Sequence, residues 1–433
     1  MSEEKFDVIV VGGGLAGLTA AYELANAGYE TLVVERGDYC GAKNMTGGRL
    51  YGHSLEKVIP GFANEAPIER KIVKENIALL NAEGGVQIAY TSPKLSEGDN
   101  ASYSVLRGKF DQWLASKAEE AGAMMVTGIR VDKVITDDAG KVIGIDAGGE
   151  EMYADVVILA DGVNSLLAQQ LGMKKEIEPH EVAVGAKEVW KLDEKTINER
   201  FGVKDGEGAA ILCAGDPTDG NLGGGFIYTN KDTVSVGIVT TLSDIGRSDV
   251  SVPKMVERFH NHPMVEPLIT GGELIEYSGH LVTEAGLSMV PELYRDGVLV
   301  TGDAAAFVIN LGYTVRGMDF AIESGRLAAE AVKKAKAVDD YSAETLSYYK
   351  KLLEESFVLR DMKKFAAFPM ILEEHMIFNE LPQFVGDVFN RMMVVNSEPS
   401  GDLVVGIAND FCSRFTMAGL ADFVSKLMGG AQK

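Results

Sequence analysis

The feature that most constrains the fold is a glycine-rich segment near the N-terminus. A mostly apolar run over residues 6–11 is typical of a strand buried on both faces of a parallel sheet. Gly12, Gly14 and Gly17 follow it, and residues 15–27 predict a helix that ends at Gly28. A second short strand is expected over residues 31–34. This order of strand, turn, helix and strand predicts a βαβ unit.

The spacing of the three glycines has a chemical meaning at such a turn. Gly12 allows a tight turn, Gly14 lets the backbone approach a pyrophosphate, and Gly17 permits close packing of helix against strand. The helix N-terminus favours the phosphate charge. Glu35 lies 18 residues after Gly17, at the end of the second strand, where a carboxylate can bind ribose hydroxyls. We therefore expect a dinucleotide-binding site rather than a purely structural turn.

Two more acidic turns follow predicted buried strands. Ala160-Asp161-Gly162 comes after the strand over residues 156–159, and Gly302-Asp303 comes after the strand over residues 297–300. Either turn alone is better explained by an aspartate that caps a strand end. Both together, in this order, resemble the distal motifs of the FAD-dependent hydroxylase-like superfamily, and this implies that Asp303 binds the ribityl chain of a non-covalent FAD.

The segment that starts at Arg107 resembles the same superfamily, in which such an arginine faces the cofactor. The alternative is the solvated start of a helix. Residues 41–53 and 310–319 resemble a narrower family, FixC (also called EtfC), which is related to electron-transfer-flavoprotein:quinone oxidoreductase. The resemblance runs from the N-terminus to about Lys336 and more loosely beyond, and it implies that residues 45–49 and 312–318 surround the isoalloxazine ring. The predicted FAD-binding residues are Gly12, Gly14, Leu15, Ala16, Gly17, Glu35, Arg36, Met45, Thr46, Gly47, Gly48, Arg49, Arg107, Ala160, Asp161, Gly162, Gly302, Asp303, Gly312, Val315, Arg316, Gly317 and Met318.

A third glycine-rich stretch lies in the middle of the chain. Residues 223–228 resemble a segment that lies beside the quinone headgroup in the quinone oxidoreductases. A glycine-bulged strand explains the stretch equally well. The predicted quinone residues are Gly223, Gly224, Gly225, Phe226 and Tyr228.

The chain has three cysteines, Cys40, Cys213 and Cys412, which are too far apart in sequence for a zinc or iron–sulfur motif. The quinone oxidoreductases carry a four-cysteine iron–sulfur module near the C-terminus, and this chain departs from them there. We expect no iron–sulfur cluster in this chain, and the resemblance implies a separate ferredoxin-like partner subunit, FixX-like. The six histidines show no metal-binding spacing, so no metal site is predicted.

The net charge of −23 argues against nucleic-acid binding, and an anionic membrane surface would repel it. Neither a secretory signal nor a transmembrane segment is evident, so we expect a cytoplasmic protein, peripheral on the inner face of the cell membrane. Residues 363–395 are rich in large apolar side chains. They predict either a membrane-interface surface or ordinary helix packing, such as a core or subunit interface, and the second is favoured.

The fold class expected for these 433 residues is α/β, with a Rossmann-type FAD domain of the p-hydroxybenzoate-hydroxylase-like class. Residues 1–178 and 286–338 form this domain, except that residues 72–105 are expected in the second domain. Residues 179–285 form an inserted antiparallel-sheet quinone or substrate domain. Residues 339–433 form a helical C-terminal region.

The family resemblance implies an oxidoreductase that acts as part of a complex. Its FAD takes electrons from the alpha and beta subunits of an electron-transfer flavoprotein (FixB- and FixA-like) and passes them to a quinone. The parent complex oxidises NADH and bifurcates its electrons between ferredoxin and quinone. No catalytic residue is assigned, because a flavin that relays electrons requires no side-chain nucleophile. The alternatives are a stand-alone enzyme, such as a geranylgeranyl-type reductase or an aromatic hydroxylase, and an assembly subunit without turnover.

Overall fold

The structure, a computed structural model, describes residues 5–44, 48–246, 248–284, 286–397 and 401–430. Its first sheet has a parallel core with the strand order β17-β10-β1-β2-β7, and β16 pairs with β17 in the antiparallel sense. β9 pairs with the first residues of β10 in the antiparallel sense, and β8 pairs with β9 to complete a hairpin. The strands are β1 (Lys5–Val11), β2 (Thr31–Glu35), β7 (Met124–Thr127), β8 (Val131–Thr136), β9 (Val142–Ala147), β10 (Glu150–Leu159), β16 (Tyr294–Arg295) and β17 (Val298–Val300).

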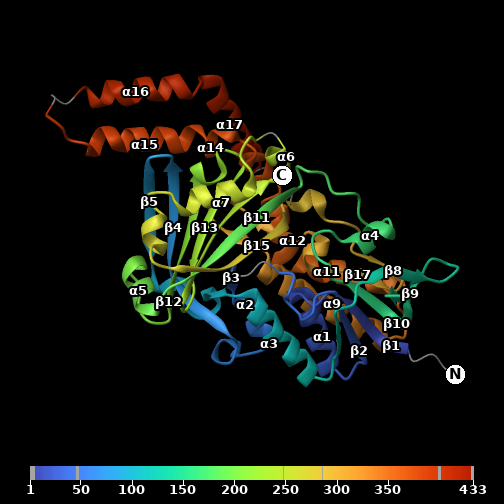
Figure 1. Cartoon of the computed structure of the whole chain (residues 1–433). Helices are drawn as coiled ribbons and strands as arrows, with labels where there is room; N and C mark the ends of the chain where they lie inside the picture. The colour runs from blue at the N-terminus through green and yellow to red at the C-terminus, as the bar shows by residue number, and fades with distance from the viewer. Residues whose placement is uncertain (1–4, 45–47, 247, 285, 398–400, 431–433) are drawn as a thin grey trace.

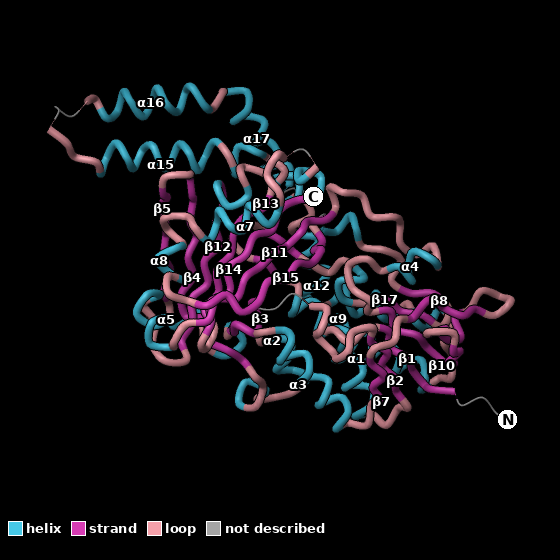
Figure 2. Tube along the Cα trace, viewed as in Figure 1, coloured by secondary structure: helices cyan, strands magenta, loops and turns pink. Residues whose placement is uncertain are grey.

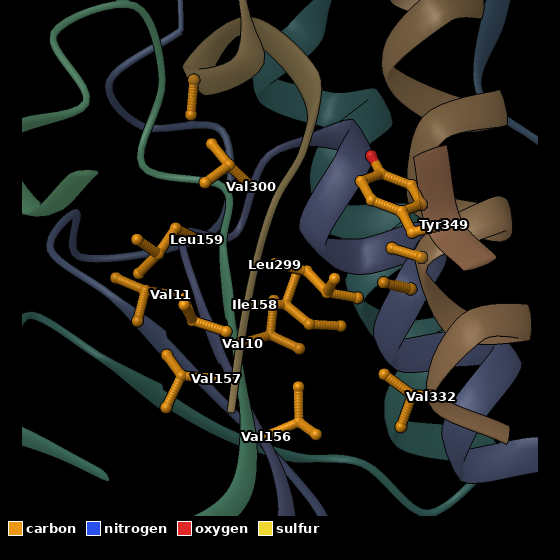
Figure 3. Close-up of a cluster of buried hydrophobic side chains, with 14 of the residues drawn as sticks. Val10, Val11, Val156, Val157, Ile158, Leu159, Leu299, Val300, Val332 and Tyr349 are labelled. Carbon is orange, nitrogen blue, oxygen red and sulfur yellow. The ribbon is translucent and has the colours of Figure 1, made fainter. Parts of the chain in front are cut away.

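The main hydrophobic core lies where this sheet meets helices. Figure 3 shows Val10, Ile158 and Leu299, from three neighbouring strands, lying toward Val332 of α9 (Met318–Ala337) and Tyr349 of α11 (Tyr348–Glu355). All three strand side chains are fully buried, and burial of such a side chain stabilises the fold by about 1.5–3 kcal/mol. The strands are apolar on both faces because both faces are buried in this core, which also contains residues of α9, of α11 and of β9, such as Ile145.

The second sheet follows the order β15-β11-β14-β13-β12-β4-β6-β3, and β5 pairs with β4. Most neighbours are antiparallel, as expected, but β4 and β12 run parallel, so the sheet is mixed. The parallel pair arises because β4 belongs to the N-terminal segment and joins the inserted strands from outside. The strands are β3 (Gly48–Tyr51), β4 (Ile68–Asn81), β5 (Gly84–Thr91), β6 (Ser102–Val105), β11 (Val182–Lys191), β12 (Glu207–Gly215), β13 (Gly223–Thr229), β14 (Thr233–Thr241) and β15 (Glu273–Thr283). The domain limits themselves stay a prediction.

Helices cover both sheets (Figures 1 and 2). α1 packs against α9 and α3, and α7 packs against β11 and β14. A short two-stranded sheet, β18 (Ile309–Asn310) and β19 (Val315–Arg316), precedes α9. The remaining helices before the C-terminal region are α1 (Leu15–Asn26), α2 (His53–Val58), α3 (Arg107–Glu120), α4 (Leu166–Gln170), α5 (Glu194–Phe201), α6 (Leu242–Ile245), α7 (Val252–His260) and α8 (Glu266–Ile269).

The C-terminal region is helical, and α15 and α16 form an antiparallel pair that extends beyond the rest of the molecule (Figure 1). α15 packs on β4 and β5 at its base. The helices are α10 (Ala343–Leu346), α12 (Phe357–Lys364), α13 (Phe368–Leu372), α14 (His375–Phe378), α15 (Glu380–Met393), α16 (Leu403–Arg414) and α17 (Met417–Gly430). No helix within the described ranges is long and apolar enough to cross a membrane.

The apolar segment over residues 363–395 divides into two parts. Ile371 and Phe378 are buried at its start. Met393, Val394 and Val395, at the far end of α15, are exposed by 66%, 65% and 91%. Although Met370 in the first part is 57% exposed, that part packs partly against the protein, whereas the second part presents an apolar surface.

Candidate functional site

A cavity of about 960 Å³ is lined by residues of both sheets and of the C-terminal helices. Its volume lies at the upper end of the range for ligand and cofactor sites. Val11, Val34 and Ala160, at or just beyond the carboxyl ends of β1, β2 and β10, line it. Parallel α/β sheets bind their ligands at this edge.

The glycine turn closes one end of this cavity. Gly12 has φ +107°, and a Cβ atom there would lie 2.3 Å from the carbonyl oxygen of Ala160. A Cβ atom on Gly17 would lie 2.1 Å from the Gly12 oxygen, so this residue allows the helix to pack on the turn. At Gly14, the N-cap of α1, a Cβ atom would meet no described atom within 4 Å, and no side chain caps the helix. The first amides of α1 are therefore available to an anion.

Glu35 ends β2 beside this turn and lines the cavity. Its carboxylate accepts hydrogen bonds from the Gly13 nitrogen at 2.7 Å and from the Gly37 nitrogen at 2.6 Å. These bonds fix the orientation of the side chain. Each carboxylate oxygen keeps a further lone pair, which can accept a bond from a ribose hydroxyl.

Asp161 and Asp303 follow β10 and β17 and also line the cavity. Burial raises the pKa of Asp161 to about 6, and its Oδ1 atom has no hydrogen-bond partner in the described part of the chain. Lys174 joins the two turns, because its Nζ atom donates to the carbonyl oxygens of Val163 at 3.0 Å and Ala304 at 3.2 Å. An unpartnered carboxylate oxygen in a cavity wall is a natural acceptor for a ligand hydroxyl.

Asp303 sits among cationic groups. Burial raises the pKa of its carboxyl group, and Arg107, His280 and Lys174 oppose this rise. The fields of Arg107, His280 and Lys174 thus offset part of the desolvation, and burial still dominates.

Arg107 is the first residue of α3, and its guanidinium lines the cavity. It donates to both oxygens of Asp111, at 2.7 and 2.8 Å, and Asp111 also accepts a bond from Asn44 at 2.5 Å. Asp111 is fully buried, whereas the Arg107 side chain is 18% exposed. This geometry differs from a solvated helix start, because a buried carboxylate orients the arginine.

Two further segments contribute to the cavity wall. Gly48 and Arg49 of β3 line it, and a Cβ atom on Gly48 would lie 3.2 Å from the Met318 side chain. Arg49 forms an ion pair with Glu75 and lies over the ring of Tyr51, 4.5 Å from its centroid. These contacts fix the position of the Arg49 charge next to the cavity.

The other segment is the loop that precedes α9, and Arg316 anchors it. The guanidinium binds Asp319 at 2.6 and 2.8 Å and Asp361 of α12 at 2.7 Å. The Nε2 atom of His53 also lies 3.2 Å from Oδ2 of Asp319. Arg316 thus ties the loop to α9 and α12, while Gly312, Val315, Gly317 and Met318 line the cavity.

The structure brings most predicted cofactor residues to one cavity. Gly17, Gly302 and Arg316 are not among the described residues that line it, and they support the wall from behind. Met45, Thr46 and Gly47 lie outside the described residues. The residues that line the cavity are Gly12, Gly14, Leu15, Ala16, Glu35, Arg36, Gly48, Arg49, Arg107, Ala160, Asp161, Gly162, Asp303, Gly312, Val315, Gly317 and Met318.

All five predicted quinone residues, Gly223, Gly224, Gly225, Phe226 and Tyr228, also line the cavity. They belong to β13, in the second sheet. The rings of Phe226 and Tyr228 are 5.5 Å apart with an angle of 30° between their planes. Burial raises the pKa of Tyr228, so its hydroxyl group stays protonated and can donate a hydrogen bond.

Three further wall residues had no local sequence signal. His280 and Val282 lie on β15, and Glu284 follows it. Burial raises the pKa of Glu284 to about 7, and Asn310 donates to its carboxyl group at 3.3 Å. Their place in the wall depends on the pairing of β15 with β11, which is a long-range feature of the fold.

The residues present fit FAD. Free helix amides suit a pyrophosphate, Glu35 suits a ribose, and the unpartnered Asp161 oxygen suits a further hydroxyl. The cavity continues past these groups to the second sheet, with room for an isoalloxazine ring. FAD supplies two-electron redox chemistry when it is bound, and the chain supplies its binding and orientation.

Comparison with known proteins agrees with this geometry. Residues 7–105 match the family model of the FAD-dependent oxidoreductases. Residues 182–282 match the model of the ubiquinone-binding region of electron-transfer-flavoprotein:quinone oxidoreductase. The second match contains β11, β12, β13 and β14 and most of β15, and all of these strands except β11 contribute residues to the cavity wall.

Solved structures share the overall fold. A geranylgeranyl bacteriochlorophyll reductase-like protein from Thermoplasma acidophilum superposes with a TM-score of 0.72 at 24% identity, over 98% of this chain and 100% of that one. A flavin-dependent brominase superposes with a TM-score of 0.64 at 18% identity, over 95% and 99% of the two chains. The predicted fold class is confirmed.

Sequence relatives are much more similar. A probable electron transfer flavoprotein-quinone oxidoreductase, YdiS of Escherichia coli, is 50% identical over 92% of this chain and 93% of its own length. Protein FixC of Salmonella typhi is 50% identical over 92% of each chain, and protein FixC of Azorhizobium caulinodans is 40% identical over the same shares. The resemblance read from the sequence motifs is confirmed. The chain belongs to the FixC family of FAD-dependent oxidoreductases, which are similar to electron-transfer-flavoprotein:quinone oxidoreductase.

Proposed function

We propose that this chain takes electrons from an electron-transfer flavoprotein and passes them, through bound FAD, to a membrane quinone. The continuity of the cavity carries this proposal. One space extends from the α1 turn, past residues 312–318, to Phe226 and Tyr228 of β13. A dinucleotide and a second planar molecule can therefore meet in one cavity. Aromatic side chains next to a protonated tyrosine hydroxyl suit a quinone ring and its carbonyl oxygen.

The proposed partners follow from membership of the FixC family. They are the alpha and beta subunits of an electron-transfer flavoprotein, FixB- and FixA-like, and a small ferredoxin-like iron–sulfur subunit, FixX-like. In the complex, NADH is oxidised and its electrons are bifurcated between ferredoxin and quinone. This chain serves the quinone branch. Its own three cysteines are free, with Cys40 and Cys213 buried and Cys412 exposed.

We further propose that the ends of α15 and α16 touch the membrane. Val395, two residues after the end of α15, and Val404 of α16 are exposed by 91% and 76%. With a net charge of −23, attachment to an anionic leaflet has to come from apolar contact rather than from charge. Leu372 and Phe378, near the base of this pair, line the cavity, so a quinone could enter from the same side.

Anaerobic purification of the natively expressed protein tests the relay. Two electron-transfer-flavoprotein subunits and a small iron–sulfur protein should co-purify with it, and the assembly should reduce a short-chain quinone when NADH is added. A lone FAD protein that NAD(P)H reduces rapidly would overturn the relay and favour a stand-alone reductase or hydroxylase.

A matched pair of variants tests the quinone wall. Tyr228→Phe removes the buried hydroxyl group of the wall, whereas Tyr90→Phe makes the same change at a tyrosine that is 55% exposed. We expect the KM for quinone to rise by roughly tenfold in the first variant, since one hydrogen bond is lost. The control should match the wild type, and both should keep their FAD. Unchanged quinone kinetics in Tyr228→Phe would place the quinone elsewhere.

A further inference from the structure

We propose that Glu284 takes up a proton when the bound FAD is reduced and releases that proton when the FAD is reoxidised. Glu284 is the first residue after β15, and it lines the cavity. The inference rests on the part of the proposed function that places FAD in this cavity. It does not depend on where the second ligand binds.

The backbone fixes Glu284 at the cofactor end of the cavity. Its N–H group donates to the Glu181 carbonyl oxygen at 2.8 Å, next to Val182, where the ladder of β15 and β11 ends. Val182 packs in a small apolar cluster with Val163 and Ala306, which belong to the segments after β10 and β17. Glu284 therefore lies where the second sheet meets the first, away from the aromatic side chains of β13.

The side chain of Asn310 connects Glu284 to the loop before α9. Its Nδ2 atom donates to the Glu284 carboxyl group at 3.3 Å, and its Oδ1 atom accepts a bond from the Gly312 nitrogen at 2.9 Å. The second bond orients the amide, so that its NH2 group faces Glu284. Asn310 and Gly312 also line the cavity. Because we expect residues 312–318 around the isoalloxazine ring, one side chain separates Glu284 from the loop that adjoins the ring.

This loop is held on its other sides as well. The Leu311 nitrogen donates to the Thr314 carbonyl oxygen at 2.9 Å, and the Thr314 hydroxyl shares a hydrogen bond of 2.5 Å with the Tyr51 hydroxyl. Arg316 binds Asp319 at the start of α9. These contacts keep the loop in place, so a charge on the ring and a charge on Glu284 stay at a fixed separation.

The surroundings of Glu284 disfavour its ionised form. Burial in the cavity wall raises the pKa of Glu284 to about 7, and the hydrogen bond from Asn310 opposes this rise. An exposed glutamate changes its charge near pH 4 to 5, roughly, whereas Glu284 does so near neutral pH. A small change in the local field therefore changes its protonation at neutral pH.

Other titratable side chains reach the wall near Glu284 from several elements. They are His180 before β11, Asp244 of α6, His280 of β15, Asp303 after β17, Glu373 after α13 and His375 of α14. Glu181, whose carbonyl oxygen binds Glu284, directs its carboxylate to the Glu178 nitrogen. The raised pKa of Glu284 follows from burial and the Asn310 bond rather than from these groups.

His280 is the alternative group for this role. Burial lowers the pKa of its imidazole, Asp303 opposes this shift, and Arg107 and Arg36 reinforce it. The imidazole is therefore neutral at neutral pH. A negative charge has to raise its pKa further than that of Glu284 before it takes up a proton, so Glu284 responds first.

Reduction of FAD supplies the change in field. FAD that takes up two electrons and one proton carries one more negative charge than oxidised FAD. At an effective dielectric constant of about 20, a unit charge roughly 10 Å from a carboxyl group raises its pKa by about one unit. In the interval of about one pH unit above 7, Glu284 is then mostly ionised beside oxidised FAD and mostly protonated beside reduced FAD.

Electrons and protons balance over the cycle in this interval. The electron-transfer flavoprotein supplies two electrons, one proton from solvent binds to FAD, and a second proton forms the O–H bond of Glu284. On reoxidation the two electrons pass to the acceptor, both bonds to hydrogen break, and two protons return to solvent. A quinone takes up two electrons and two protons, so reoxidation by a quinone leaves no net proton change.

Redox titration of the chain with bound FAD tests the proton site. Glu284→Gln replaces the carboxyl group by an amide of the same shape that stays neutral at every pH. Between about pH 6 and about pH 9, the wild-type equilibrium should shift about tenfold toward oxidised FAD relative to this variant, which is about 30 mV in potential. Glu273→Gln, at an exposed position on β15, is the control and should match the wild type.

A second substitution moves the interval itself. Asn310→Leu removes the hydrogen bond that opposes the rise in the pKa of Glu284. The pH at which the wild-type potential begins to fall should then increase by up to about one unit.

Infrared difference spectra of the wild type need no substitution. At about pH 7.5, reduction should add the carbonyl band of a protonated carboxyl group, and this band should be missing in Glu284→Gln. A difference in potential between the wild type and Glu284→Gln that stays constant with pH overturns the proton site, and so does a wild-type spectrum without the band. If both results are as expected but a short-chain quinone fails to reoxidise the reduced FAD, the proposed function fails and the proton site stands.

Discussion

The pair of Arg107 and Asp111 allows a role in binding FAD to be separated from a role in packing. Asp111 is fully buried and accepts two bonds from Arg107 and one from Asn44. In Arg107→Met this carboxylate loses its cation, and breaking such a buried pair costs about 3–5 kcal/mol. Because the Arg107 side chain is 18% exposed, we expect a loss near the lower end, about 3 kcal/mol in the free energy of unfolding.

The double variant Arg107→Met/Asp111→Leu removes the uncompensated charge as well. Replacement of a buried ion pair by apolar side chains is often nearly neutral, so its stability should return to within about 1 kcal/mol of the wild type. The coupling energy between the two sites should then be at least about 2 kcal/mol, and larger by whatever the single variant Asp111→Leu costs. Urea unfolding of the FAD-free proteins measures both quantities.

FAD binding should not recover with stability. Arg107 lines the cavity beside Asp303, and a charge-assisted hydrogen bond contributes about 1.5–3 kcal/mol. Both variants should therefore bind FAD about 10- to 100-fold more weakly, as titrated by flavin fluorescence. A double variant with wild-type stability and wild-type FAD affinity would refute this reasoning and leave Arg107 as a structural ion pair.

Three other substitutions test the framework of the site. Gly12→Ala should yield protein that lacks FAD and whose free energy of unfolding is lower by about 2 kcal/mol or more. The reason is that the new Cβ atom would lie 2.3 Å from the Ala160 oxygen, at a residue with positive φ. Flavin content and urea unfolding measure the two effects. Arg70 is buried and donates to three carbonyl oxygens. Arg70→Met should therefore lower the free energy of unfolding, measured in urea, by about 3–5 kcal/mol without a direct change in FAD chemistry. The folded-state pKa of Asp161, about 6, exceeds the unfolded value, so the native state binds more protons and loses stability as pH rises from about 4 to 6. Asp161→Asn without FAD should therefore be roughly 2–3 kcal/mol more stable than the wild type at pH 7 and equal to it near pH 4; a constant difference across this range would contradict the assignment.

The cofactor end of the cavity was predictable because its information is local. The glycine spacing, Glu35, Asp161 and Asp303 all lie at strand ends, and the carboxyl ends of parallel strands meet at one edge whatever the strand order. Gly17 was predicted to serve packing, and the structure gives the reason, since a Cβ atom there would lie 2.1 Å from the Gly12 oxygen.

Long-range pairings account for what sequence could not predict. The parallel pairing of β4 with β12 joins segments more than a hundred residues apart, and no local pattern encodes it. His280 and Glu284 lie in the cavity wall only because β15 pairs with β11 in one register. A shift of one residue would turn His280 to the opposite face. Arg316 shows the same limit, because its partner Asp361 comes from a later helix.

The two walls of the cavity offer different chemical groups to a ligand, and the proposed function assigns FAD to one wall and the quinone to the other. The first sheet offers backbone amides and single carboxylates at its edge, which suit the phosphates and hydroxyls of a dinucleotide. The second sheet offers the side chains of a flat face that draws on β13, β14 and β15. Substitutions on that face can alter the second ligand while the cofactor site stays intact.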